Sequence, residues 1–412
     1  MTEKLYYLDS HCAEHGATVL ACEKADGGFA VTLDRSALFP EGGGQPADHG
    51  TIDGVAVLDV QERGAGAGAD AVHLCAGPLP VGKSVRVRLD WARRFDLMQQ
   101  HTGEHLLSFA FYKLFSANNV GFHLAETYAT IDFDKPLSRA EITEAERLAN
   151  TFVWRDLPVT ATFYDTEEAA LAALPVRKHA AGLVPPIRIV SVEGADCCTC
   201  CAPHCAHTGE VGAIFVLDSA AYKGGTRITF YCGGRALNDA RTEHDALDAI
   251  ARRFSVSRDK AEAAVAKLSD DFAESRRREK LLAAALNAYE AAAFRAEADA
   301  VNAGHGGARA PIVRLVEQAD AQRLRDLAVK VAGDDGFAAL FARENGRLSY
   351  VLAKGASLPL DISDAAAAVN AAVNGKGGGR GQLAQGTAPD GAHLCDAIEQ
   401  LSAYFTKRLK NA

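Results

Sequence analysis

Two pairs of metal-binding residue types stand out in this sequence, and both have the same spacing. His101 and His105 are four residues apart within residues 91–115, where apolar side chains recur at helical spacing without a proline. Residues four apart lie on one face of a helix, so the two imidazoles can converge on one ion. Cys200 and His204 repeat this offset about a hundred residues later. Because imidazoles and a thiolate form the ligand set that zinc prefers, these residues predict a zinc site.

A glycine-rich segment is a second candidate site. Gly42, Gly43 and Gly44 are consecutive and stand shortly after Phe39 and directly before Gln45. Each glycine costs backbone entropy on folding, so a triplet is expected where the backbone must approach a ligand closely or turn sharply. A flexible loop is the alternative. The aromatic and amide neighbours favour a site, because flexible linkers are usually rich in Gly and Ser.

The elements that must position these residues predict an α+β fold in four parts. Residues 1–90 contain short β-rich runs separated by Gly, Asp and Pro turns, a rhythm typical of a β-barrel-like domain or a sandwich. Residues 91–236 mix helix and strand as a zinc-binding core, with a helix capping box beginning at Ser138. Residues 237–303 have the three- and four-residue apolar spacing of a long helical connector. Residues 304–412 alternate strands and helices as an α/β domain.

Composition and charge narrow the class of protein. The chain has 412 residues, 48% of them hydrophobic and 24% charged, as in ordinary globular proteins. It shows neither an apolar run of about 20 residues nor a signal-peptide layout, so we expect a cytoplasmic protein without a membrane partner. Five of the ten cysteines fall within residues 197–205, a cluster that favours metal binding or reduced thiols over disulfides. A net charge of −9 argues against a general nucleic-acid coat but allows a local basic surface.

Two basic segments are candidates for such a surface. Residues 275–280 read Ser-Arg-Arg-Arg-Glu-Lys, which fits either a solvated helix face or an RNA contact. Residues 375–381 are expected to form a glycine loop, whose backbone N–H groups beside Lys376 and Arg380 could hold a phosphate. A flexible loop is again the alternative. The segment is not a Walker motif, because Gly377 follows the lysine where Ser or Thr should bind magnesium.

In combination these motifs resemble a known family. Residues 40–45, Pro-Glu-Gly-Gly-Gly-Gln, the His-x-x-x-His at 101 and the Cys-x-x-x-His at 200 followed by Thr-Gly-Glu at 208 resemble the editing domain of alanyl-tRNA synthetase. Residues 377–386 resemble the DHHA1 domain that ends that synthetase. Because the chain has no room for an aminoacylation domain, it looks like the long form of the stand-alone AlaX alanyl-tRNA editing proteins.

The resemblance implies hydrolysis of the ester between tRNA(Ala) and a wrongly attached amino acid, chiefly serine, with glycine as a second candidate. The implied partner is mischarged tRNA(Ala), with self-association through the C-terminal half left open, and ATP binding is implied by resemblance alone. By motif position, the resemblance assigns one zinc ion to His101, His105, Cys200 and His204 and places Gln45 at the substrate. We further expect substrate binding by Gly42, Gly43, Gly44 and Gln45, a catalytic role for Gln45, and tRNA binding by Lys376 and Arg380.

Several points depart from the family pattern or allow other functions. The usual Cys-Gly-Gly-Thr-His is here Cys-Cys-Ala-Pro-His, which adds the thiol of Cys201, and the nearby cysteines leave room for a second metal or for redox sensitivity. Four protein ligands suggest a structural zinc, whereas a catalytic zinc keeps an open position. His101-Thr-Gly-Glu-His also fits the H-x-x-E-H pattern of a metallopeptidase with Glu104 as base, although we expect Glu104 on the helix surface. A non-catalytic, zinc-containing tRNA-binding protein is the remaining alternative.

Overall fold

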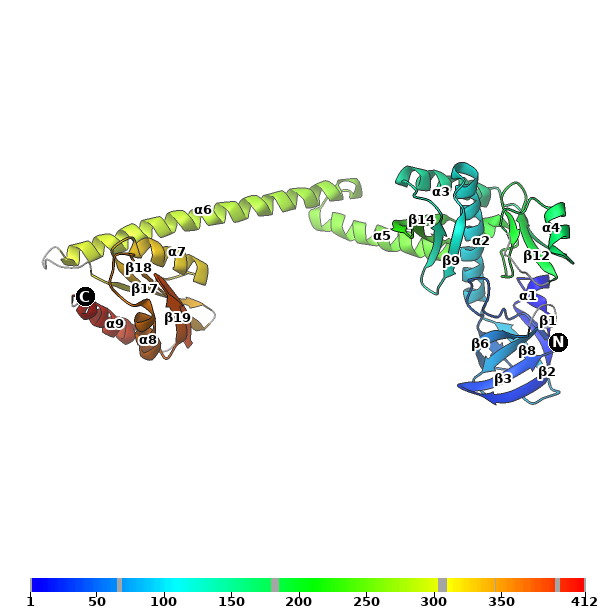
Figure 1. Ribbon diagram of the computed structural model, residues 1–412, viewed down its shortest axis with the longest axis horizontal. Helices are drawn as coiled ribbons and strands as arrows, with labels where there is room; N and C mark the ends of the chain where they lie inside the picture. Colours follow the sequence, from blue (N-terminus) through cyan, green and yellow to red (C-terminus); the bar gives the residue numbers. More distant parts are fainter. Residues whose placement is uncertain are drawn as a thin grey trace. The chain divides into compact units, whose positions relative to one another are not determined.

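The computed structural model describes residues 2–64, 69–178, 185–302, 310–344, 346–389 and 393–410. The chain falls into two compact units, Met1–Arg253 and Phe254–Ala412 (Figure 1). The N-terminal unit contains every residue predicted for the zinc site and the glycine segment at 42–45. The boundary lies inside the predicted helical connector, and the four-part division remains a prediction.

Six strands of the N-terminal unit close into a barrel in the order β2-β3-β7-β6-β5-β8. In β8, Val85 and Val87 are buried while Ser84, Arg86 and Arg88 are exposed, the alternation of a strand with one face on a core. This is the closed form of the β-rich domain that the sequence predicted. The strands are β2 (Glu14–Ala25), β3 (Gly28–Leu33), β5 (Gly50–Ile52), β6 (Val55–Arg63), β7 (Asp70–Cys75) and β8 (Ser84–Leu89). Beside them, β1 (Glu3–Lys4) pairs with β4 (Arg35–Ser36) and is followed by the short helix α1 (Leu5–Leu8).

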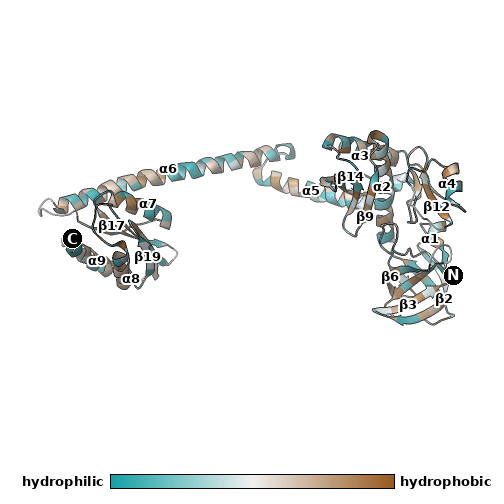
Figure 2. Ribbon diagram, viewed as in Figure 1, coloured by the Kyte–Doolittle hydropathy of each residue, from teal (hydrophilic) through white to brown (hydrophobic). Residues whose placement is uncertain are grey.

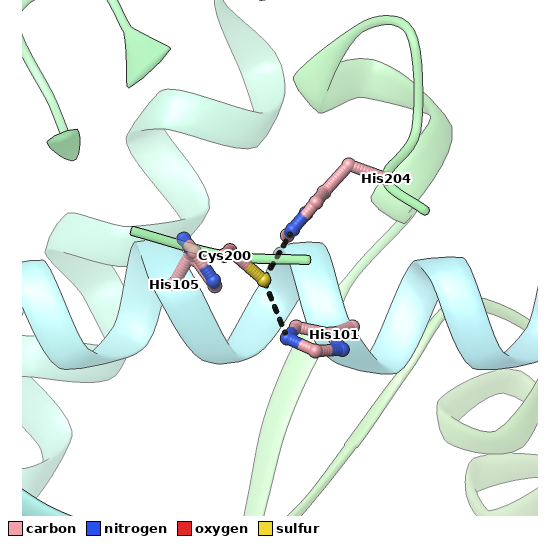
Figure 3. A group of neighbouring side chains, drawn as sticks. All are labelled: His101, His105, Cys200 and His204. Carbon is pink, nitrogen blue, oxygen red and sulfur yellow. Dashed lines mark hydrogen bonds between the residues drawn. The ribbon is translucent and has the colours of Figure 1, made fainter. Parts of the chain in front are cut away.

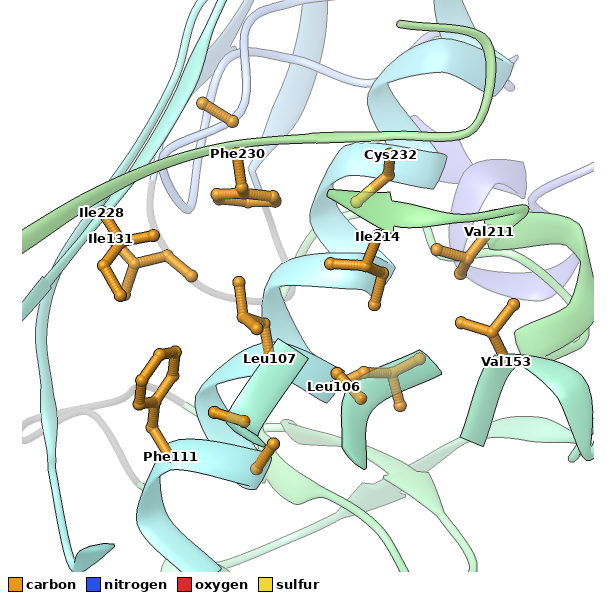
Figure 4. Close-up of a cluster of buried hydrophobic side chains, with 14 of the residues drawn as sticks. Leu106, Leu107, Phe111, Ile131, Val153, Val211, Ile214, Ile228, Phe230 and Cys232 are labelled. Carbon is orange, nitrogen blue, oxygen red and sulfur yellow. The ribbon is translucent and has the colours of Figure 1, made fainter. Parts of the chain in front are cut away.

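The helix predicted at residues 91–115 is α2 (Trp91–Phe115), and it forms the centre of the N-terminal unit. The Asp90 side chain caps its first turn by accepting a hydrogen bond from the Arg93 backbone N–H. Its apolar face, including Leu107 and Phe111, packs against the sheet β14-β15-β10-β9 (Figure 4). A Cβ at Gly103 would lie 2.2 Å from Cys232 Sγ, so glycine lets the helix approach β15 closely. The strands are β9 (Asn119–Leu124), β10 (Ala129–Phe133), β14 (Ile214–Tyr222) and β15 (Gly225–Cys232).

A third sheet, in the order β11-β12-β13, carries the cysteine-rich segment. Its strands are β11 (Val159–Tyr164), β12 (Ile187–Val192) and β13 (Cys197–Thr199), with α4 (Glu167–Ala173) packed on one side. Before it, α3 (Arg139–Trp154) begins with the predicted capping box, in which Ser138 and Glu141 bond each other's backbone N–H groups. The chain leaves β13 directly into Cys200 and passes through the short helix η2 (Thr208–Val211) to β14.

The predicted connector forms two helices, α5 (Gly233–Phe254) and α6 (Ala261–Asn302), separated by the turn η3 (Arg258–Lys260). Figure 2 shows hydrophilic and hydrophobic residues alternating along the whole of α6. Among the described residues, no helix combines the length and the apolar character needed to cross a membrane.

The C-terminal unit contains a five-stranded sheet in the order β16-β17-β18-β20-β19, covered by helices on both faces. One face packs on α6 and α7 through residues such as Leu327 and Leu340, and the other packs on α8 and α9 through Phe341 and Phe405. This is the α/β domain that the sequence predicted. The elements are β16 (Ile312–Leu315), α7 (Ala321–Ala332), β17 (Phe337–Glu344), β18 (Arg347–Lys354), α8 (Ile362–Val373), β19 (Lys376–Arg380), β20 (Leu383–Pro389) and α9 (Leu394–Lys410).

The glycine loop expected at residues 375–381 is wrong. Lys376–Arg380 form the edge strand β19, paired antiparallel with β20. A Cβ at Gly377 would lie 2.4 Å from the Tyr350 hydroxyl oxygen, and one at Gly386 would lie 2.5 Å from the same oxygen. These glycines therefore make room for the Tyr350 side chain, and their number does not indicate a phosphate-holding loop.

Candidate metal centre

The four residues predicted as zinc ligands lie together in the N-terminal unit (Figure 3). We call His101, His105, Cys200 and His204 the metal group. Their ligand atoms are all within 4.8 Å of one another, although α2 supplies two of them and the segment after β13 the other two. Cys200 Sγ lies 3.4 Å from His101 Nε2 and 3.3 Å from His204 Nε2. A tetrahedral zinc with bonds of about 2.0–2.3 Å holds its ligand atoms roughly 3.3–3.8 Å apart, so the group has suitable dimensions.

Each histidine of the group is held by a neighbour at its Nδ1 atom. His101 Nδ1 lies 3.0 Å from Gln45 Oε1, and His204 Nδ1 lies 3.1 Å from Thr102 Oγ1. Cys205 donates its backbone N–H to the same Thr102 oxygen, which ties the cysteine-rich segment to α2. Metal-ligating histidines commonly have such partners, which fix the ring and leave the other nitrogen for the ion.

The third histidine, His105, has the most elaborate surroundings. Its Nδ1 lies 3.0 Å from Asp196 Oδ2, and Arg177 donates two hydrogen bonds to the same carboxylate. Burial lowers the pKa of His105, but Cys198 and Asp196 outweigh burial and raise it well above its ordinary value. His105, Asp196 and Cys198 form a second group of metal-ligand types. Because Arg177 already occupies both carboxylate oxygens, Asp196 is better explained as the partner of a ligating histidine.

The protonation states of Cys200 and His204 suit metal binding. Burial raises the pKa of the Cys200 thiol, but His101 and His204 outweigh burial and hold it well below its ordinary value. Burial lowers the pKa of His204 to about 3, so this imidazole is neutral at pH 7. Thiolate and neutral imidazole are the forms that coordinate metals. The donor set, its burial and its spacing therefore fit a zinc ion.

The glycine segment at 42–45 reaches this group from the barrel side. Gly42 and Gln45 close a tight turn by exchanging backbone hydrogen bonds of 3.1 and 3.0 Å. Gly43 has a φ of +60°, and a Cβ there would lie 3.0 Å from Cys201 Sγ. Glycine is therefore needed both for the turn and for the approach of the cysteine-rich segment. Gln45 is buried and contacts His101, and its Nε2 has no partner among the described residues.

A buried ion pair joins this segment to α2. Arg94 Nε lies 3.1 Å from Asp48 Oδ1, and both side chains are completely buried. Asp48 also accepts the backbone N–H of Phe39, 2.6 Å away, so its carboxylate connects the two ends of residues 39–48. The segment that carries the glycines is thus attached to the helix that carries His101.

A cavity of about 750 Å³ opens beside the metal group. His101, His105 and Cys200 line it, together with Gly43, whereas His204 does not. The cavity therefore gives a ligand access to one side of the group.

Glu104 also lines this cavity, and its predicted position on the helix surface is wrong. Glu104 is 5% exposed, and its side chain accepts hydrogen bonds from Ser108 Oγ at 2.6 Å and Asn119 Nδ2 at 2.5 Å. α2 is buried around most of its circumference, so a charged residue in it does not mark a solvent face.

Other functional candidates were not evident from the sequence. Asp196 and Thr102 contact the histidines, and Arg188 lines the cavity, but no motif or spacing singles them out. Lys376 and Arg380 lie in the C-terminal unit, with exposed side chains on the edge strand β19.

Two family models match the chain: the threonyl and alanyl tRNA synthetase second additional domain over residues 187–229, and the DHHA1 domain over residues 311–407. The chain thus combines a match to this second additional domain, over the cysteine-rich segment, with a match to the DHHA1 domain in the C-terminal unit.

Curated relatives make the resemblance specific. The alanyl-tRNA editing protein Aarsd1 of Mus musculus is 33% identical over 257 residues, covering 59% of this chain and 61% of the relative. The alanyl-tRNA editing protein AlaX-L of Pyrococcus horikoshii is 35% identical over 246 residues, covering 58% and 60%. The alanine–tRNA ligase of Halorubrum lacusprofundi is 31% identical over 420 residues, covering 97% of this chain and 43% of the ligase. The matched region is about three fifths of the editing relatives' length. The chain is a homologue of proteins named alanyl-tRNA editing proteins and contains a match to the DHHA1 domain, which confirms the predicted resemblance.

Proposed function

We propose that this protein is a zinc-dependent hydrolase that removes wrongly attached amino acids from tRNA(Ala), chiefly serine. The observation that carries the proposal is the convergence of His101, His105, Cys200 and His204 beside a cavity. The names of the homologues, alanyl-tRNA editing proteins, supply the substrate class. Glycine on tRNA(Ala) is a second candidate substrate.

The chemistry requires an activated ester or an activated water. Zinc, when bound, supplies Lewis acidity that polarises a carbonyl or lowers the pKa of water to about 7. The chain contributes the thiolate of Cys200 and three oriented imidazoles. We propose that Gln45 acts through His101, whose ring it holds, and that Gly43 contacts the substrate because it lines the cavity.

Selectivity for serine over alanine follows from polar groups in the cavity wall. A pocket that hydrogen-bonds a hydroxyl rejects the analogue that lacks it, because buried polar groups are then left unpaired. The wall contains the uncharged polar side chains of Asn119 and Thr199 near the metal group. We propose that groups of this kind bond the serine hydroxyl.

The test is release of serine from Ser-tRNA(Ala), measured beside Gly-tRNA(Ala) and Ala-tRNA(Ala). The wild-type protein should hydrolyse the serine ester far faster than the alanine ester. The double variant His101→Ala, His105→Ala should lose both bound zinc and this activity. His123→Ala, which removes an exposed histidine of β9, is the matched control and should retain both. Full activity of a zinc-free double variant would refute the assignment, and tRNA binding without ester loss would favour the non-catalytic alternative.

A further inference from the structure

Arg188, on β12, lines the cavity without an acidic partner. Its Nη1 donates to the backbone oxygens of Cys200 at 2.8 Å and Ala202 at 2.9 Å, and its Nε is buried with no hydrogen-bond partner in the described part of the chain. No carboxylate of the described residues lies within ion-pair distance of it, whereas Arg94 and Arg177 are each paired with a buried aspartate. A partly buried guanidinium without a counter-charge is suited to bind an anionic group.

Two aromatic side chains, Tyr7 and Phe163, line the cavity together with Arg188. Arg188 Cζ lies 5.4 Å from the centre of the Tyr7 ring, and Tyr7 lies edge-on to Phe163 with ring centres 5.8 Å apart. Phe163 is the cross-strand neighbour of Arg188 in the β11–β12 pair, so both side chains project from the same face of the sheet. Phe163 is 40% exposed, which leaves much of its ring free to contact a ligand.

A cation beside aromatic faces is better suited to bind a nucleotide than a small amino acid. Single-stranded nucleic acids are bound by bases stacked on aromatic rings and by basic side chains on phosphates. In an aminoacyl-tRNA, the ester lies on the terminal ribose, between the terminal base and the last phosphodiester. The bond from Arg188 to the Cys200 carbonyl places this cluster directly beside the metal group.

We propose that Arg188, Tyr7 and Phe163 form the subsite for the terminal nucleotide of the acylated RNA. The two rings contact the base, and the guanidinium donates hydrogen bonds to the last phosphodiester. The subsite rests on the proposed function and extends it, since it specifies how the RNA end is held while the ester faces the metal group.

The experiment compares Ser-tRNA(Ala), which contains the last phosphodiester and the rest of the RNA, with the nucleoside ester 3′-O-seryl-adenosine, which contains only the terminal nucleoside. Arg188→Gln should raise KM for Ser-tRNA(Ala) by about tenfold, the effect of losing a charge-assisted hydrogen bond. Its kcat and its zinc content should stay near the wild-type values, and KM for the nucleoside ester should not change. Arg188→Lys, which keeps the positive charge, should recover most of the affinity for the tRNA.

The aromatic residues are tested in the same assay. Tyr7→Ala and Phe163→Ala should each raise KM by about five- to tenfold for both substrates, because both contain the terminal base. Arg139→Gln is the matched control, since Arg139 is an exposed arginine at the start of α3 that does not line the cavity. It should behave as wild type with both substrates.

Three results would overturn the subsite. Loss of zinc, or an equal rise of KM for both substrates, in Arg188→Gln would mean that Arg188 only braces the backbone at Cys200. Unchanged KM values in all three variants would mean that the RNA end binds elsewhere. If the wild-type protein releases serine from neither substrate, the proposed function fails instead. The subsite is then judged by binding of an uncharged acceptor-stem RNA, which should weaken in Arg188→Gln.

Discussion

Asp196 Oδ2 lies 3.0 Å from His105 Nδ1, so a buried carboxylate holds one nitrogen of a histidine in the metal group. Arg177 donates to both oxygens of this carboxylate, at 2.6 and 3.1 Å. With Nδ1 occupied in this way, Nε2 is the nitrogen of His105 that remains for an ion. The orientation of His105 in the metal group therefore depends on Asp196, which is not itself needed as a ligand.

Asp196→Asn should weaken zinc binding by about 10- to 100-fold, because the histidine loses the charge that orients it and raises its basicity. Zinc affinity is measured by competition with a chelator on folded protein. Asp132→Asn, which breaks the partly exposed pair with Arg227, serves as the control and should leave zinc affinity unchanged. A folded Asp196→Asn variant with wild-type affinity would contradict the role given to this carboxylate.

Glu104→Gln should keep most of the deacylase activity. The amide retains an oxygen that can accept the hydrogen bonds from Ser108 and Asn119. Removal of a true general base lowers the rate by about 10²- to 10⁴-fold, so a loss of that size would show that Glu104 acts as the base, the role that glutamate has in the H-x-x-E-H pattern. Glu104→Ala should instead destabilise the N-terminal unit by about 2 kcal/mol, since it leaves buried donors unpaired.

Asp48→Asn should destabilise the N-terminal unit by about 3–5 kcal/mol, because Arg94 would then be a buried charge without a counter-charge. Trp91 and Trp154, the two tryptophans of the chain, both lie in this unit, so urea unfolding followed by tryptophan fluorescence measures its stability. Asp53→Asn breaks a solvent-exposed pair with Lys83 and should cost less than about 1 kcal/mol. Equal effects of the two substitutions would argue against the importance of the buried pair.

The stability of the N-terminal unit should fall as the pH drops from about 6.5 to about 4. His73 is completely buried between Ser36 and Val31, and burial lowers its pKa to about 4. Over this range the unfolded chain binds a proton that the folded chain does not, so about 3 kcal/mol is lost as the pH falls. His73→Gln should remove this part of the pH dependence, whereas substitution of the exposed His393 should preserve it. Identical pH profiles for wild type and His73→Gln would disprove the assignment.

Replacing Lys376 and Arg380 with glutamine should make tRNA binding weaker and less sensitive to salt. If each side chain neutralises one phosphate, the slope of log affinity against log salt should decrease by roughly 0.7–0.9 per residue. Arg325→Gln, an exposed change on α7 in the same unit, is the control. An unchanged slope in the double variant would remove these two residues from the RNA interface.

The sequence predicted the helices, the strands and the ligand pairs of this protein better than the contacts that surround them. Helix α2 begins and ends where its apolar periodicity does, and the metal group follows from two pairs of ligand types at helical spacing. Glu104 was misplaced because local periodicity does not show that several elements cover α2. Asp196 and Arg188 could not be found, because their roles arise only when β12 and β13 bring them beside residues of α2 or α1.

The glycines of β19 illustrate a different limit. Consecutive glycines fit a ligand-holding loop or a closely packed strand equally well, and only the position of Tyr350 distinguishes the two. In the run of consecutive glycines at 42–44, by contrast, Gly43 does line a cavity. The difference lies in contacts between residues far apart in the chain.

Gly43 and Tyr7 precede α2 in the chain, yet both contribute to the wall of the cavity beside the metal group. The barrel and the residues around it are therefore inseparable from the chemistry that the histidines support. A transplant of the segment with the histidines into another scaffold would lose the part of the cavity wall that residues before α2 supply. Gene fusions that keep the proposed activity should consequently inherit both portions as a single block.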